Sequence, residues 1–173
     1  MPIRRATIDD AEAIAAIYND AIENTTAVMY HDPQPASLWR DQLAQQCEPQ
    51  HPFLVSTTDG PSETAGDTLA GFAKLDAFDP RCGYDDIADV AIYIAPDHRG
   101  QGHGRALLTA LIDAGQAAGL HSILARITAD NAASIKLHES LGFALVGTYH
   151  QLGRKFGKRH DVSEYQLVLR NDV

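Results

Sequence analysis

The sequence predicts a mixed fold, α/β or α+β by convention, in which one sheet has helices on its faces. Three observations favour it. The chain has 173 residues, the length of one ordinary domain, with 45% hydrophobic and 21% charged residues, the balance of a folded globular protein. Strand-like and helix-like hydrophobic periods follow one another along the chain. It contains no internal repeat and no long low-complexity linker, so a single domain over residues 1–173 is expected.

The first elements are expected to be a short strand over Ile3–Ala6 and then a helix. Thr7 or Asp9 can cap this helix, the latter with Glu12 three positions on. A second helix is expected over Pro35–Gln46. Two strands, Phe53–Thr57 and Leu69–Leu75, flank the polar loop Thr57–Thr68.

The clearest strand signal covers Ile87–Ala95. Alternation places Val90, Ile92 and Ile94 on one face and Asp89, Ala91 and Tyr93 on the other. The helix Gly104–Ala118 follows, with Gly119 as its stop and with a core face of Leu107, Leu108, Leu111 and Ile112.

The last third of the chain continues the alternation. We expect a strand over His121–Thr128 and a helix over Asn131–Leu141 that is closed by Gly142. Two final strands are expected, roughly Ala144–Gln151 and Val162–Leu169.

Composition excludes several classes of function. The net charge of −9 argues against a nucleic-acid partner, which needs a basic surface. No apolar run is long enough to cross a bilayer, and the N-terminal residues fit neither a secretory nor a transit peptide. The two cysteines, Cys47 and Cys82, are too few for a disulfide framework, so a reducing cytoplasm is expected. The eight histidines form no spaced set with cysteines or acids that indicates a metal site.

A glycine-rich turn, Arg99-Gly100-Gln101-Gly102-His103-Gly104, separates the clearest strand from the clearest helix. The unpaired amides and partial positive charge of a helix N-terminus bind anions, and glycines let an oxyanion approach them. The spacing fails the dinucleotide fingerprint, and no Gly-Lys-Ser/Thr forms a P-loop. The remaining pattern, Arg-x-x-Gly-x-Gly after a strand, is either a capping turn that binds nothing or an anion site of another class.

This pattern resembles the pyrophosphate-binding turn of the GCN5-related N-acetyltransferases. Other segments resemble the same superfamily: Arg4–Thr7 with Asp10 at the start, and Asp130–Ser134 followed by Leu137–Phe143. A narrower likeness is to the phosphinothricin and methionine sulfone or sulfoximine acetyltransferases. It rests on Asp32–Gln34, Arg81, Tyr84, Ala91–Ile94, Lys155–Gly157 and His160–Val162.

The resemblance implies a mostly antiparallel central sheet flanked by helices on both faces, with acetyl-CoA as co-substrate and direct transfer in a ternary complex. It also implies a homodimer and a small amino-acid-like acceptor, such as phosphinothricin or methionine sulfone or sulfoximine. Asp89 and His138 stand at the catalytic positions. The residues implied to bind the cofactor are Ile92, Tyr93, Ile94, Arg99, Gly100, Gln101, Gly102, His103, Gly104, Arg105, Asn131 and Ser134.

The chemistry of amine acetylation suits these assignments. A free amine is mostly ammonium at neutral pH, so a base must remove a proton, and Asp89 is placed to do so. The resembled enzymes have glutamate at this position, and aspartate is one methylene shorter, so Asp89 needs a bridging water or reflects a different acceptor. The alternative is that Asp89 is a solvated strand-edge carboxylate without a catalytic role. His138 can act as a proton shuttle or thiolate partner, or it can be packed or capped without a catalytic role.

The acceptor site is expected to include Met29, Arg81 and Tyr84, with Arg81 binding a substrate carboxylate. Met29, Asp79 and Arg159 depart from the resembled enzymes, which makes a phosphinothricin acceptor less secure than a small amino acid or its analogue. Two alternatives remain. An open, acidic cleft would favour a protein N-terminus, lysine or polyamine as acceptor, and a CoA-binding domain without turnover is the other.

Overall fold

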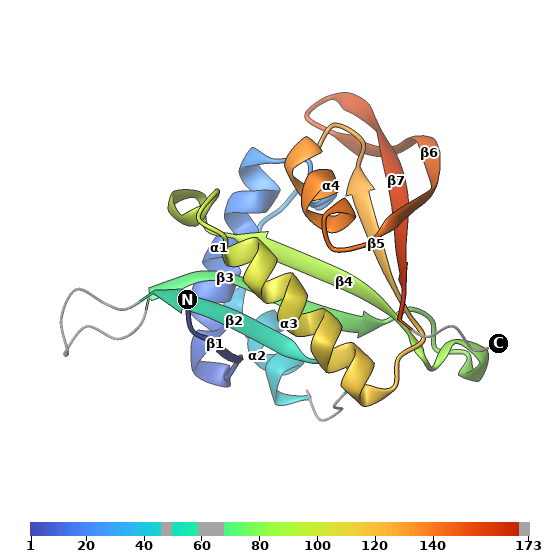
Figure 1. Cartoon of the computed structure of the whole chain (residues 1–173). Coiled ribbons are helices and arrows are strands. Elements are labelled where there is room, and N and C mark those ends of the chain that lie inside the picture. The colour runs from blue at the N-terminus through green and yellow to red at the C-terminus, as the bar shows by residue number, and fades with distance from the viewer. Residues whose placement is uncertain (46–49, 59–67, 170–173) are drawn as a thin grey trace.

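The structure, a computed structural model, describes residues 1–45, 50–58 and 68–169. The strands of this described part form one sheet in the order β1-β2-β3-β4-β5-β7-β6 (Figure 1). Their bounds are Ile3–Arg5 (β1), Phe53–Thr58 (β2), Thr68–Ala77 (β3), Ile87–Ile94 (β4), Ser122–Thr128 (β5), Ala144–Lys155 (β6) and Lys158–Val168 (β7). The helices are Ala11–Asn24 (α1), Ala36–Ala44 (α2), His103–Ala118 (α3) and Ala132–Glu139 (α4), with short 3₁₀ turns at Ile8–Asp10, Cys82–Tyr84 and Pro96–His98.

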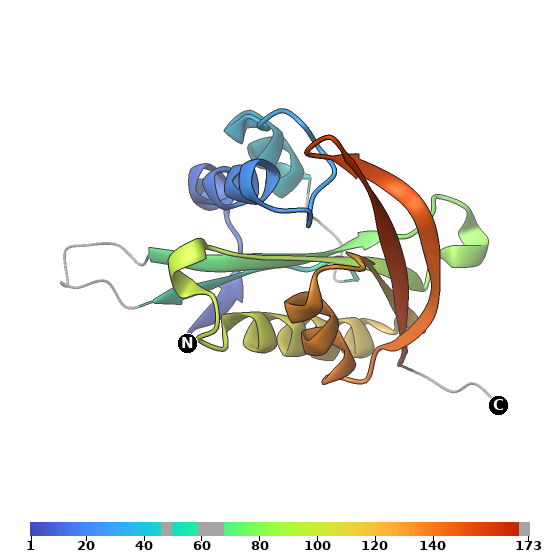
Figure 2. The ribbon, with the colours of Figure 1, turned by 90° about the horizontal axis from the view of Figure 1, so that it is seen from above.

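Helices cover both faces of this sheet. Figure 2 shows α1 and α2 on one face and α3 and α4 on the other. All neighbouring strands pair antiparallel except β4 and β5, which pair parallel. The predicted mixed fold, with a mostly antiparallel sheet between helices, is therefore confirmed.

Side-chain alternation along β4 divides the core into two parts. Val90, Ile92 and Ile94 pack with the leucines of α3, and Tyr93 packs with the residues of α1 and α2. This is the division that the alternation of the sequence predicts. It places Asp89, on the face of Tyr93, toward the α1 side.

The pairing of β4 with β5 ends early. The register covers only Ile87 with Ser122, Ala88 with Ile123 and Asp89 with Leu124. Beyond Asp89 both strands continue without each other, β4 against β3 and β5 against β7. Figure 1 shows them diverging from this point. The sheet is thereby opened along the last five residues of β4.

The start of the first helical segment decides between the two predicted caps in favour of Thr7. Thr7, followed three positions later by Asp10, forms the reciprocal capping box, and the Asp9–Glu12 pair does not. The Thr7 amide donates to Asp10 Oδ2 at 2.8 Å, and Arg4 clamps the same carboxylate at 2.7 and 2.8 Å. Burial raises the pKa of Asp10, but these hydrogen bonds and the Arg4 charge outweigh it and leave the pKa below its ordinary value.

The other elements lie within a few residues of their predicted bounds, apart from the last two strands. These extend to Lys155 and from Lys158, so they form a longer hairpin than the sequence indicates. Gly119 ends α3 in the left-handed conformation, with φ of +91°, as predicted. Cys47, Gln46 and most of the predicted polar loop lie outside the described residues.

Within the described ranges, no helix combines the length and the apolar character needed to cross a membrane.

Candidate active site

The open edge of β4 presents backbone groups toward the gap left by β5. The Ala95 amide donates to Ala70 of β3 at 2.9 Å, so alternation directs the backbone of Tyr93 to β3 as well. The backbone groups of Ile92 and Ile94 then face the gap. Of the three strand residues predicted to bind the cofactor by their backbone, Tyr93 is the one whose amide and carbonyl are directed to β3.

The N-terminus of α3 supplies a second set of unpaired amides. Its first intrahelical hydrogen bond is donated by Ala106 to Gly102, so the amides of residues 103–105 have no intrahelical acceptor. Gly102 caps the helix with φ of +93°, a conformation that side chains rarely adopt. At Gly104 a Cβ would lie 3.2 Å from Leu137 of α4, which explains why glycine suits this close approach.

The side chains of this turn are engaged within the protein. Arg99 Nη2 lies 2.8 Å from Asp20 of α1, and its Nε donates to the Ile94 carbonyl at 3.2 Å. Gln101 donates to the Asp97 carbonyl, and Arg105 donates to Ser140 Oγ at 2.7 Å. The arginines thus brace the turn against α1 and α4.

His103 is buried in this turn and shares a 2.7 Å hydrogen bond between its Nδ1 and Ser56 Oγ of β2. Burial lowers the pKa of His103, and the neighbouring His98 lowers it further. His103 therefore anchors α3 to the sheet as a neutral ring, and its side chain points away from the open edge.

The N-terminus of α4 completes this side of the opening. Asn131 Oδ1 caps the helix by accepting from the Ser134 amide at 3.1 Å. The structure thus brings together the backbone of Ile92 and Ile94, the first turn of α3 and, beside it, α4. Amides on an extended edge and at a helix N-terminus fit a ligand with a long, hydrogen-bonding arm that ends in a pyrophosphate.

His138 lies inside α4 on the α3 face of the sheet. It is buried, its ring packs edge-on against Phe143 at 5.0 Å, and its Nδ1 lies 2.8 Å from the Ser134 carbonyl. Burial lowers the pKa of His138, although the Ser134 hydrogen bond raises it in part. His138 and Asp89 therefore occupy opposite faces of the sheet.

Asp89 stands where β4 and β5 separate, and Arg126 of β5 contacts it. Arg126 Nη2 lies 2.6 Å from Asp89 Oδ2, while Asp89 Oδ1 is buried and has no hydrogen-bond partner. Burial raises the pKa of Asp89 above its ordinary value, and the charge and hydrogen bond of Arg126 offset this only in part. Asp89 is thus a carboxylate with a free acceptor oxygen and increased basicity.

Other acids surround this pair. Asp76 is opposite Asp89 on β3, and Glu164 is opposite Arg126 on β7; both raise the pKa of Asp89. Arg126 is not among the site residues predicted from the sequence, where its only signal is its alternation on β5. Its contact with Asp89 depends on a strand pairing that one sequence does not reveal.

An aromatic group covers the same face closer to α1. Tyr18 packs edge-on against Tyr93 at 5.0 Å and against Trp39 at 4.9 Å, and Tyr93 packs against Phe72 at 5.1 Å. Burial raises the pKa of Tyr18 to about 12, and it also raises that of Tyr93. Both phenols therefore stay protonated at neutral pH and make this wall uncharged.

The predicted acceptor residues Met29, Arg81 and Tyr84 do not lie together within this single chain. Arg81 binds Asp79 of its own loop through Nε at 2.7 Å and Nη2 at 2.9 Å, and it lies over the Tyr84 ring. This loop is joined to the first residues of β5, because the His121 amide donates to the Asp86 carbonyl.

Met29 lies at the other end of β5. Its side chain fills the space beside Gly153 of β6, where an added Cβ would approach it within 2.8 Å. The loop that contains Met29 reaches the last residue of β5, since Thr26 Oγ1 lies 3.2 Å from Thr128 Oγ1. The seven residues of β5 span about 20 Å. Met29 and the pair Arg81–Tyr84 are therefore separated by the length of a strand.

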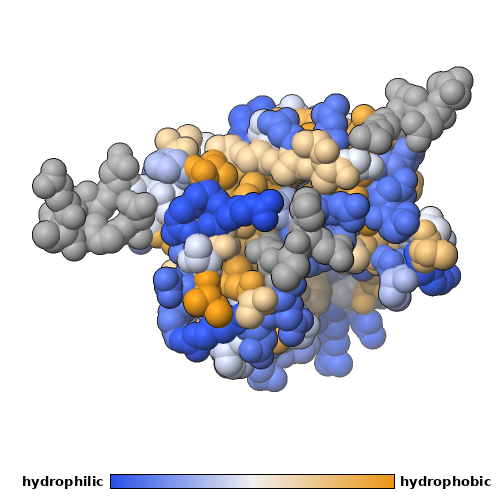
Figure 3. Space-filling model, turned by 90° about the horizontal axis from the view of Figure 1, so that it is seen from below, coloured by the Kyte–Doolittle hydropathy of each residue, from blue (hydrophilic) through white to orange (hydrophobic). Residues whose placement is uncertain are grey.

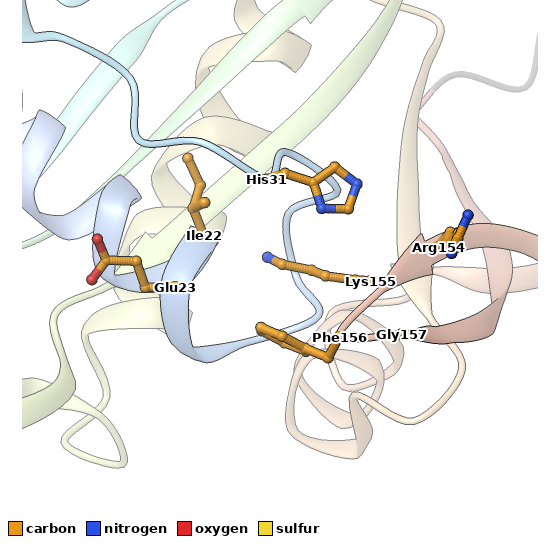
Figure 4. Close-up of a pocket in the computed structure, with 7 residues that line it drawn as sticks. All are labelled: Ile22, Glu23, His31, Arg154, Lys155, Phe156 and Gly157. Atoms are coloured by element: carbon orange, nitrogen blue, oxygen red, sulfur yellow. The ribbon is translucent and has the colours of Figure 1, made fainter.

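A cavity of about 670 Å³ opens beside this loop, at the tip of the β6–β7 hairpin. The close-up in Figure 4 shows Lys155 extending from the hairpin toward α1 and the loop after it, with Arg154 turned away. Lys155 is buried, and its Nζ donates to the Val28 carbonyl at 2.6 Å. Burial lowers the pKa of Lys155. Arg81 lines neither this cavity nor a second one between α2 and β3.

No group of three or more His, Cys, Asp or Glu side chains is gathered into a metal site in the described part of the chain.

Comparison with known proteins identifies relatives over nearly the whole chain. Residues 14–143 match the model of the acetyltransferase (GNAT) family. The L-methionine sulfoximine/L-methionine sulfone acetyltransferase of Pseudomonas aeruginosa is 40% identical over 170 residues, which cover 96% of this chain and 94% of the relative. The phosphinothricin N-acetyltransferase of Streptomyces viridochromogenes is 33% identical over 164 residues, covering 95% and 85%.

Solved structures agree with these relatives. YncA from Salmonella typhimurium, determined with its cofactor acetyl-CoA, superposes with a TM-score of 0.92 at 33% identity and covers 100% of this chain and 96% of that one.

Proposed function

This chain belongs to the GNAT family of acetyltransferases and is an acetyl-CoA-dependent N-acetyltransferase; from that premise we propose that it acetylates the amino group of a small amino acid or analogue by direct transfer in a ternary complex. The observation that supports this most is the position of Asp89. Its free, buried oxygen lies at the point where the edge of β4 becomes open. A base for the acceptor thus adjoins the proposed donor site.

The donor residues act mainly through their backbone. Ile92 and Ile94 bind the extended arm as a further strand would, and the amides of residues 102–105 hold the pyrophosphate at the positive end of α3. Arg99, Gln101, His103 and Arg105 keep this turn in place, and Asn131 and Ser134 border it from α4. Acetyl-CoA supplies an activated acetyl group as a thioester, with the thiolate as leaving group.

Asp89 prepares the acceptor. An ammonium with a pKa of about 8 to 10 carries the proton at neutral pH, so Asp89 accepts it, directly or through water, and leaves a neutral amine. The β4 amide that faces the gap can donate to the acetyl carbonyl oxygen as negative charge develops on it. His138 sits across the sheet from Asp89, and its predicted role as shuttle or thiolate partner stays a prediction.

A panel assay tests the proposal. We expect thiol release from acetyl-CoA with methionine sulfone, methionine sulfoximine or phosphinothricin, the acceptors in the names of the relatives. The Asp89→Asn variant should lower kcat about 10²- to 10⁴-fold, because it retains shape but cannot take a proton. Asp113→Asn, an exposed carboxylate on α3, is the matched control.

The pH profile gives an independent check. Since the base must be ionised and the pKa of Asp89 is raised, kcat/KM should fall as the pH falls through that pKa, at a higher pH than for an ordinary aspartate. The pH profile of Asp89→Asn should lack this fall in kcat/KM at low pH. Turnover that is unchanged in Asp89→Asn contradicts the assignment of the base.

A second acceptor class has one observation in its favour. Asp76, Asp89 and Glu164 surround the opening with negative charge, which suits a cationic amine such as a polyamine or a lysine side chain. Adding spermidine and a lysine peptide to the panel decides between the classes by kcat/KM. Saturable acetyl-CoA binding without turnover of any amine would support a binding domain instead.

We also propose that the chain forms a homodimer through β6, the outer strand of the sheet. This strand and the turn after it expose large hydrophobic side chains, with exposed fractions between 48% and 59%, at Leu145, Val146, Tyr149, Leu152 and Phe156. An exposed apolar sheet edge is a ready surface for another chain. By contrast, Figure 3 shows mostly hydrophilic residues on the face seen from below, with smaller hydrophobic groups between them. A cytoplasmic location remains the expectation from the cysteine content.

A further inference from the structure

Asp89 and Arg126 present opposite charges side by side on the α1 face of the sheet. The contact is single, from Nη2 to Oδ2 at 2.6 Å, so most of the donors of the guanidinium remain available. The Arg126 side chain is 56% exposed and that of Asp89 is 19% exposed. Asp89, the proposed base, is thus largely buried, whereas the Arg126 guanidinium is accessible to solvent.

The other arginines of the candidate site have partners away from Asp89, and two of them, Arg81 and Arg99, make two side-chain hydrogen bonds each. Asp79 takes both Nε and Nη2 of Arg81, in the two-pronged geometry that a substrate carboxylate would need. Arg99 bridges Asp20 and the Ile94 carbonyl, and Arg105 is bound to Ser140, the C-cap of α4. Arg126 is the one of these four that directly contacts the proposed base.

We propose that Arg126 binds the α-carboxylate of the amino-acid acceptor and thereby frees Asp89 to serve its amine. The inference rests on the proposed function, since it names the acceptor contact of that reaction. An amino acid has a carboxylate and an ammonium one carbon apart. The carboxylate of the amino acid binds the Arg126 guanidinium, and its ammonium binds the Asp89 carboxylate. The substrate carboxylate thereby replaces Asp89 on Nη2 of Arg126.

The charges balance through the exchange. The carboxylate of the acceptor takes over the ion pair with Arg126, and the ammonium becomes the counter-ion of Asp89. One N–H bond of the ammonium then breaks as an O–H bond forms on Asp89, and the neutral amine is left beside the donor. An amine without a carboxylate leaves Arg126 on Asp89 Oδ2 and gains no binding contact from it, while Asp89 Oδ1 can still accept its proton. Arg126 is therefore a specificity-determining residue.

Kinetics with a matched pair of probes test this. The probes are L-methionine sulfone and its carboxamide, which differ only in the charge that Arg126 would bind. The proteins are wild type, Arg126→Gln and Arg126→Lys. The control is Arg40→Gln, which removes an exposed arginine paired with Glu12 far from the opening. Thermal melting of each variant separates a folding defect from a binding defect.

We expect Arg126→Gln to raise KM for L-methionine sulfone at least about tenfold while changing kcat/KM for the carboxamide less than threefold, because a charge-assisted contact is lost for one probe only. Arg126→Lys should recover part of the loss, and Arg40→Gln should behave as wild type.

Two results overturn the inference and can be told apart. If the wild type prefers the amino acid and Arg126→Gln keeps that preference, the role of Arg126 fails while the proposed function stands. If the wild type binds acetyl-CoA but acetylates neither probe, or prefers the carboxamide, the amino-acid acceptor fails and the role of Arg126 fails with it.

Discussion

At the scale of single residues, burial has opposite effects on the two predicted catalytic groups: it raises the pKa of Asp89 and lowers the pKa of His138. Asp89 has a raised pKa and an unpartnered oxygen, which suit a base. The Nδ1 of His138 is committed to the Ser134 carbonyl, its ring packs on Phe143, and its pKa is lowered. A neutral ring held in this way stabilises α4 against the sheet.

We therefore predict that His138→Asn costs stability more than catalysis. Losing the packed ring and its hydrogen bond should lower the free energy of unfolding by about 1–3 kcal/mol, measured by urea denaturation. The value of kcat should fall less than in Asp89→Asn. A loss of kcat of about 100-fold with an unchanged unfolding midpoint would instead support the catalytic role that the resemblance implies.

At the scale of elements, the hairpin tip and the loop after α1 depend on each other. Lys155 donates to Val28 at 2.6 Å, and the same loop contacts β5 through Thr26 and Thr128. Removing the ammonium leaves the Val28 carbonyl without this donor. We predict that Lys155→Met lowers the free energy of unfolding at pH 7 by about 1–3 kcal/mol and speeds hydrogen exchange in residues 25–30.

The pH dependence of the same lysine has a defined sign. Because the folded pKa of Lys155 is lowered, the unfolded state binds more protons between that pKa and 10.5, so this residue makes wild-type stability rise with pH in that window. Lys155→Met should lose that rise, whereas the exposed Lys158→Met control should keep it. Equal slopes in all three proteins would contradict the assignment.

The elements also show which features a single sequence can predict. Helices and strands follow from local periodicity, and Gly119 is a local signal, so these predictions agree with the structure. The sequence leaves Thr7 and Asp9 as alternative caps, and the binding of Asp10 by Arg4 favours the Thr7 cap. Arg126 and Lys155 act through partners in remote segments, and their contacts follow from topology, which periodicity does not encode.

At the scale of the whole molecule, the exposed edge of β6 sets the expected assembly. We predict that wild-type protein is dimeric in solution and that Val146→Asp with Leu152→Asp makes it monomeric, since two charges would enter the apolar contact. Sedimentation velocity over a range of concentrations measures this. Leu38→Asp, which alters an exposed leucine on α2, is the control. A monomeric wild type at all concentrations would contradict the proposal.

The gap between β4 and β5 has an evolutionary consequence. In the proposed site, the donor is bound by main-chain amides of β4 and α3, which nearly every substitution leaves in place. The acceptor is bound by side chains on the other strands, such as Arg126. A change in one codon can replace any of these side chains. Descendants of such a chain can exchange one acceptor for another while they keep the same donor, so a whole family can diversify its substrates from one scaffold.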